Sequence, residues 1–112
     1  LWRMGTAQSQ QLRANIEIQA STSGFVVNVE VLQGALGGAP QVRYAPSGST
    51  NYQQATCQLM SGSANAKAGQ SATFLCPAAL TAGGTYDIIV TIPGAGGRGF
   101  SKQISGVMVP VT

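Results

Sequence analysis

The segment Leu80-Thr-Ala-Gly83-Gly-Thr-Tyr86, which continues as Asp-Ile-Ile-Val-Thr-Ile92, carries the strongest indication of the fold. A leucine, a glycine three residues later and a tyrosine three residues after that lead into an apolar strand. This spacing is typical of a tyrosine corner, in which the phenol hydroxyl bonds to the backbone a few residues upstream and fixes a crossover between two strands. We therefore predict that Leu80, Gly83 and Tyr86 form such a corner. The alternative is a tyrosine that simply begins a strand.

Short runs of alternating apolar and polar residues lie on both sides of this segment. Residues 12–20 alternate strictly, and residues 25–31 place Phe25 and three valines on one face. Turns rich in Gly, Ser and Pro separate the runs, and no window after residue 11 has sustained helical spacing. The pattern predicts an all-β fold, an immunoglobulin-like Greek-key β-sandwich of about seven antiparallel strands. The expected strands are residues 12–20, 24–32, 40–45, 52–60, 70–76, 85–92 and 98–109.

The first eleven residues, LWRMGTAQSQQ, do not share this alternation. Leu1-Trp2-Arg3-Met4 is typical of the interfacial end of a membrane helix, where an indole and a cation lie at the level of the lipid headgroups. The alternative is an unstructured terminus. We therefore expect a tail at residues 1–11 and one sandwich domain at residues 12–112, a size that suits a single core.

Two cysteines, Cys57 and Cys76, are the only ones in the chain. An isolated pair in an extracytoplasmic β-protein is most simply one disulfide, which places the protein outside the cytoplasm. The alternative is two buried free thiols in a reducing compartment. Their spacing and the missing partner ligands exclude a CxxC redox motif or a zinc site.

The composition leaves few side chains for chemistry. The chain has no histidine and three carboxylates, at Glu17, Glu30 and Asp87. General acid–base catalysis, hydrolytic zinc and activated nucleophiles depend on these residue types, so we expect no enzyme, no metal and no cofactor. Gly94-Ala-Gly-Gly-Arg-Gly99 matches G-x-G-x-x-G, but the residues after it predict a strand where a dinucleotide site needs a helix.

The six cations are spread along the chain without a run or an interleaved aromatic residue. We read them as solubilising charges and expect no nucleic-acid binding. No apolar run is long enough to cross a bilayer, and no N-x-S/T sequon occurs.

In the predicted topology three loops meet at one end of the sandwich, at residues 33–39, 61–69 and 93–99. They are rich in Gly, Ala and Ser, which permit close backbone approach and suit packing against another copy. The alternative is a set of ordinary solvent-exposed loops. The candidate contact residues are Gly34, Gly37, Gly38, Lys67, Gly96, Gly97 and Arg98.

Cys57 and three segments carry a family resemblance: residues 25–31 (FVVNVEV), residues 68–76 (AGQSATFLC) and residues 80–90 (LTAGGTYDIIV). They resemble the immunoglobulin-like outer domain of archaeal type IV pilins and archaellum-associated filament proteins. The resemblance implies a low-charge β-sandwich after an N-terminal hydrophobic helix, whose end would correspond to Leu1–Gly5. It implies no catalytic residues.

These observations predict a non-catalytic structural module outside the cytoplasm, the globular domain of a pilin-like or archaellum-associated surface filament protein. Its expected partners are copies of itself or surface-layer and filament proteins. Contact with a membrane is expected only through an upstream helix that this chain does not contain. The alternative is a binding or adhesion module of a larger secreted or cell-surface protein.

Overall fold

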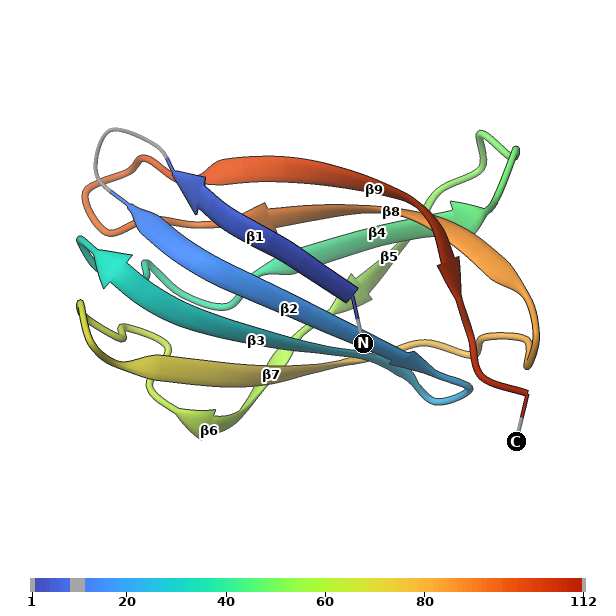
Figure 1. Ribbon diagram of the computed structural model, residues 1–112, viewed down its shortest axis with the longest axis horizontal. Coiled ribbons are helices and arrows are strands. Elements are labelled where there is room, and N and C mark those ends of the chain that lie inside the picture. Colours follow the sequence, from blue (N-terminus) through green and yellow to red (C-terminus); the bar gives the residue numbers. More distant parts are fainter. Residues whose placement is uncertain (1, 9–11, 112) are drawn as a thin grey trace.

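The computed structural model describes residues 2–8 and 12–111, with side chains from Leu12 onward, and this part of the chain forms an antiparallel β-sandwich (Figure 1). The predicted all-β sandwich is confirmed, with nine strands in the described residues where about seven were expected. One sheet has five strands, in the order β1 (Trp2–Gln8), β2 (Arg13–Ser21), β3 (Gly24–Gln33), β7 (Ser71–Pro77) and β6 (Gln58–Gly62).

The second sheet has four strands and lies behind the first in the view of Figure 1. Both sheets are built by antiparallel pairing between strands that are far apart in the chain, β3 with β7 and β4 with β8. The strand order of the second sheet is β5 (Gln53–Thr56), β4 (Gln41–Pro46), β8 (Thr85–Ile92) and β9 (Phe100–Met108).

The core forms because every second residue of the main strands is apolar. In β2 the buried positions alternate with exposed or half-buried ones, and β8 shows the same alternation from Tyr86 to Ile92. The two inward faces meet as one apolar cluster with no buried polar or charged residue among the described side chains. The largest fully buried side chains include Phe25, Phe74, Leu12, Ile16, Ile18, Leu36, Ile88 and Ile92.

The structure of the N-terminal segment differs from the predicted tail. Residues 2–8 form strand β1, which pairs antiparallel with β2, in place of a tail or a helix end. Neighbouring strand β2 offers an open row of backbone donors and acceptors, and pairing satisfies that row although β1 itself has a weak alternation. Leu1 and residues 9–11 of the expected tail lie outside the described residues.

The strand expected at residues 52–60 is in fact two strands in different sheets. β5 pairs with β4 in the second sheet, the chain then crosses at Cys57, and β6 pairs with β7 in the first sheet. Both exposed edges on this side of the sandwich are therefore short. Short edge strands are one of the ways in which proteins avoid unwanted strand pairing.

The last strand, β9, is shorter than the predicted 98–109 and contains a β-bulge near Gly106. Lys102 pairs with Val90, a core residue, so it occupies an inward-facing position of this edge strand, where its side chain remains exposed. β9 is also close to β1 of the other sheet (Figure 1).

The molecule measures 36 × 25 × 21 Å, and its strands follow the long axis (Figure 1). The loops at residues 34–40, 63–70 and 93–99 meet at one end, which we call the loop pole. The loops at residues 47–52 and 78–84 lie at the other end, the opposite pole, together with the end of β9.

Candidate functional site

The three loops of the loop pole are joined by backbone hydrogen bonds. The amide of Leu36 donates to the Ala66 carbonyl at 2.8 Å, and the amide of Gly37 donates to the Pro93 carbonyl at 2.9 Å. The amide of Ala95 donates back to the Ala35 carbonyl at 2.9 Å. The loop after β3 thus lies between the other two loops and binds to both, with Leu36 and Ala66 fully buried beneath it. The pole is a closed cap and not an open pocket.

Small residues are needed for this closure. A Cβ added to Gly37 would lie 2.7 Å from the backbone of Gly94, and a Cβ on Gly94 would overlap the Arg98 carbonyl oxygen. The close backbone approach that the sequence suggested is therefore used within the molecule, between its own loops.

The structure brings together all seven predicted contact residues at this pole. Gly38 is half-buried, and the other six are exposed: Gly34, Gly37, Lys67, Gly96, Gly97 and Arg98. The G-x-G-x-x-G match is a turn between β8 and β9, and a strand follows it where a dinucleotide site needs a helix.

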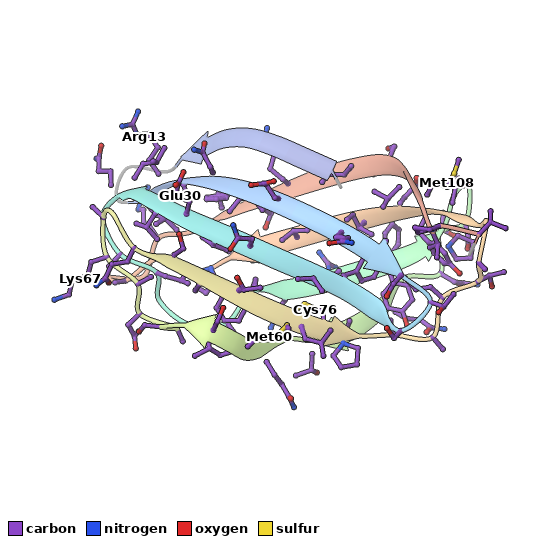
Figure 2. The ribbon with its side chains drawn as sticks, turned by 60° about the horizontal axis from the view of Figure 1, so that its bottom comes forward. Arg13, Glu30, Met60, Lys67, Cys76 and Met108 are labelled. Atoms are coloured by element: carbon purple, nitrogen blue, oxygen red, sulfur yellow. A yellow bond between two sulfur atoms is a disulfide. The ribbon has the colours of Figure 1, made fainter. Side chains whose placement is uncertain are left out.

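The cations, which are scattered in sequence, also gather here. Arg13 begins β2 and pairs with Gln33, the last residue of β3. Leu12, the residue before Arg13, lies close to Gly94 of the β8–β9 loop, because a Cβ added to Gly94 would be 3.4 Å from the Leu12 Cβ. Arg13 and Lys67 project at the same end of the molecule in Figure 2, and Arg98 lies in the adjoining loop. The sequence analysis missed this grouping because the three residues come from separate parts of the chain.

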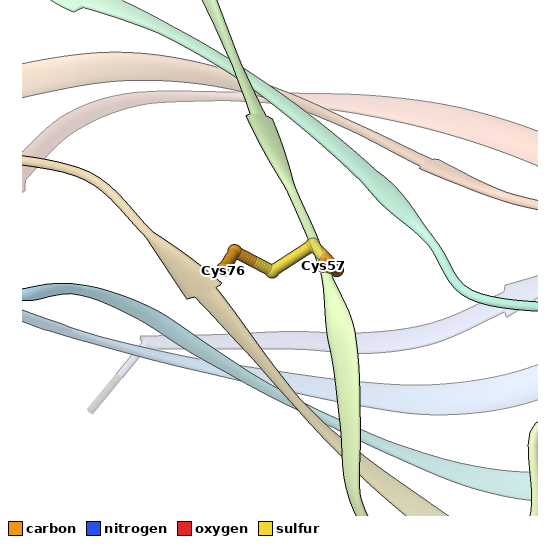
Figure 3. The surroundings of a disulfide bond; sticks show 2 residues. All are labelled: Cys57 and Cys76. Atoms are coloured by element: carbon orange, nitrogen blue, oxygen red, sulfur yellow. A yellow bond between two sulfur atoms is a disulfide. The ribbon is translucent and has the colours of Figure 1, made fainter.

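The two predicted cysteines form a disulfide (Figure 3). Its Cα atoms are 4.0 Å apart, Cys76 is fully buried in β7, and Cys57 is 7% exposed. Cys57 lies at the point where the chain leaves β5 and enters β6, so the bond fixes the crossing between the sheets. A formed disulfide is characteristic of an oxidising, extracytoplasmic environment.

The tyrosine corner has the expected contact. The hydroxyl oxygen of Tyr86 accepts a hydrogen bond from the Thr81 amide at 2.8 Å, and only 7% of the residue is exposed. The Leu80 amide donates to the Thr22 carbonyl, and the Gly83 amide donates to the Val109 carbonyl. The β7–β8 crossover is therefore bonded both to the β2–β3 turn and to the end of the chain.

Asp87 makes a second tie near the opposite pole that sequence reasoning missed. Its Oδ1 atom accepts hydrogen bonds from the Gly106 amide at 3.1 Å and the Ser47 hydroxyl at 2.9 Å, and Oδ2 accepts one from the Gly48 amide at 3.4 Å. The Gly106 amide, and then the Ser47 hydroxyl, lower the pKa of this carboxyl below its ordinary 3.8 because they stabilise the ionised form. The feature of the sequence that could have indicated this contact is a single aspartate at the start of an apolar strand.

The aromatic side chains of the second sheet face inward. Tyr44 packs against Phe25 and Tyr86, with ring centroids 5.7 and 6.2 Å away, and Phe100 lies against the core. They do not make the flat aromatic strip that sugar stacking requires.

An open depression of about 360 Å³ at the β6–β7 turn is lined by Gly62, Ser63, Gln70 and Ser71. Two of these polar side chains are used by the loop itself: Gln70 accepts from the Lys67 amide and Ser63 from the Asn65 amide.

Within residues 2–8 and 12–111, no group of three or more His, Cys, Asp or Glu is placed to hold a metal ion. The same residues contain no helix with the length and apolar character needed to cross a bilayer. No protein-family model matches the chain, and no match was found among curated proteins or solved structures.

Proposed function

We propose that this chain is a non-catalytic structural module that works outside the cytoplasm through protein–protein contacts. Its most specific form is the globular domain of a pilin-like or archaellum-associated surface filament protein. The observation that carries the proposal is the construction of the loop pole and the sheet crossing. Both are built from specific internal bonds, the first from backbone hydrogen bonds between loops and the second from a disulfide.

Two further features support the proposal. Charged residues make up 8% of the chain, against about a quarter in a typical soluble domain, which suits a surface that faces other protein. The Cys57–Cys76 disulfide suits an extracellular location, where no reducing pool would open it. In this proposal an upstream filament helix would end before Trp2, because β1 begins there.

The test is to express the complete reading frame that contains this chain and to label cells with an antibody raised against residues 12–112. We expect label along surface filaments in electron micrographs. We also expect an apolar segment of about 20 residues upstream of Leu1. Label confined to a soluble secreted protein without filaments would contradict the proposal and favour an adhesion module of a larger protein.

A further inference from the structure

Three exposed cations define the charge of the loop pole: Arg13, Lys67 and Arg98. Each comes from a different element: Lys67 and Arg98 are in loops that both bond to the loop after β3, and Arg13 begins β2, where the preceding Leu12 lies close to Gly94. No salt bridge to these cations is found among the side chains that the structure describes. Lys102 adds a fourth positive charge a short distance along β9. Four of the chain's six cations, Arg13, Lys67, Arg98 and Lys102, are therefore at or near this end.

At this end of the molecule the cations outnumber the carboxylates. Asp87 is near the opposite pole and accepts three hydrogen bonds there. Glu30, toward the loop-pole end of β3, accepts a hydrogen bond from the Asn15 amide group at 3.0 Å. Glu30 keeps its negative charge in this bond and is at the same end as Arg13 in Figure 2, so the three cations and this one carboxylate leave the loop pole net positive.

We infer that the loop pole is a docking surface for an acidic polysaccharide. Backbone bonds join the three loops across the pole, so an extended partner would lie across their surface. Separate cations on a firm surface match a polymer that repeats carboxylate groups, and the contact is electrostatic. The exposed side chain of Gln33, which is paired with Arg13 in the strand register, is suited to hydroxyl groups.

Other anionic partners fit this surface less well. The exposed large apolar side chains are elsewhere: Leu59 and Met60 are on β6, and Met108 and Val111 are at the opposite pole. Among the described side chains, the pole therefore has no large exposed apolar residue to enter a bilayer. Phe100 packs against the core and offers no face for nucleic-acid bases, and the disulfide indicates an environment outside the cytoplasm.

The test uses polygalacturonate as the probe, with uncharged dextran as the control polymer. Isothermal titration calorimetry should show binding to polygalacturonate and none to dextran. NMR amide shifts should change at residues 34–37, 66–68 and 95–98. Raising the ionic strength from about 0.05 to about 0.3 M should weaken binding strongly because the contact is electrostatic.

A matched pair of variants locates the surface. Arg98→Gln removes a cation from the pole and should weaken binding about two- to fivefold. Arg43→Gln makes the same change on the outer face of the second sheet and should leave binding within error of the unmodified chain. The combined Arg13→Gln, Lys67→Gln and Arg98→Gln variant should lose about tenfold or more. Unchanged melting temperatures would show that each variant remains folded.

Several results would overturn the inference. Equal losses from Arg98→Gln and Arg43→Gln would show attraction by net charge alone. Tighter binding to phosphatidylglycerol vesicles or duplex DNA than to polygalacturonate would assign the pole to a different partner. The inference requires no self-association, so its failure is distinct from a failure of the filament proposal.

Discussion

At the scale of single residues, two side chains tie distant backbone segments together. Tyr86 holds the crossover between the sheets through the Thr81 amide, and Asp87 joins the turn after β4 to the bulge in β9. They are neighbours in the chain, and their side chains point to opposite faces of β8. Because successive side chains of a strand point to opposite faces, β8 makes one of these contacts on its core side and the other on its surface side.

Tyr86→Phe should lower the free energy of unfolding by about 1–2 kcal/mol, because the Thr81 amide would lose its acceptor, the hydroxyl of the buried Tyr86. Urea unfolding measures this change. Tyr44→Phe is the matched control, since its hydroxyl bonds to the exposed Gln53 side chain and its loss should cost about 0.5 kcal/mol or less. Equal losses in the two variants would argue that the corner does not stabilise the fold.

Asp87 should make stability depend on pH in the acid range. Its folded-state pKa is lowered, so its contribution is fully present above the ordinary value of 3.8 and is lost as the pH falls through the folded value. Thermal unfolding from about pH 6 to about pH 2 should show a smaller acid loss in Asp87→Asn than in the unmodified chain. Glu30→Gln removes one carboxylate elsewhere and serves as the control. If Asp87→Asn reproduced the unmodified pH profile, the hydrogen-bonded carboxylate would not be the cause.

At the scale of elements, the crossing between β5 and β6 is the least regular part of the sandwich. Both strands are short, β6 is exposed along its whole length, and the disulfide lies at their junction. Since few buried contacts hold β6 in place, the covalent bond should matter most here.

Replacing both cysteines, as Cys57→Ala with Cys76→Ala, should lower the free energy of unfolding by roughly 3 kcal/mol, because an unfolded chain without the closed loop has more conformations. Denaturant unfolding measures the loss, and hydrogen exchange should show that β5 and β6 lose more protection than β2. The unmodified chain in reductant should approach the variant, and the variant should not respond to reductant. Free thiols in native material would remove the basis for this prediction and for an extracytoplasmic location.

At the scale of the whole molecule, the edge strands of both sheets have features that hinder pairing with a further strand. β5 and β6 are short, β6 and β9 contain bulges, and Lys102 occupies an inward-facing position of β9. A strand added at β9 would have to bury this ammonium group, which is unfavourable. Contacts between copies are therefore expected through faces or poles and not by edge pairing.

Lys102→Val should increase concentration-dependent association, because it removes the charge that blocks pairing along β9. Light scattering over a concentration series would detect this change. Gln103→Val also adds a valine to β9 but on its outer face, beside Ile89, and should associate less. Association of both variants to the same degree would indicate a general effect of apolar surface.

By itself the sequence determined the class of fold, the two cysteines that pair and the tyrosine that locks the crossover. These are local signals, because alternation with a period of two and a short motif are visible within about ten residues. Tertiary structure decided the rest: strand pairing by residues 2–8, the switch of sheets at Cys57, the partners of Asp87 and the meeting of Arg13, Lys67 and Arg98. Each of these depends on which distant segments become neighbours, and that is set by how the two sheets close over a common core.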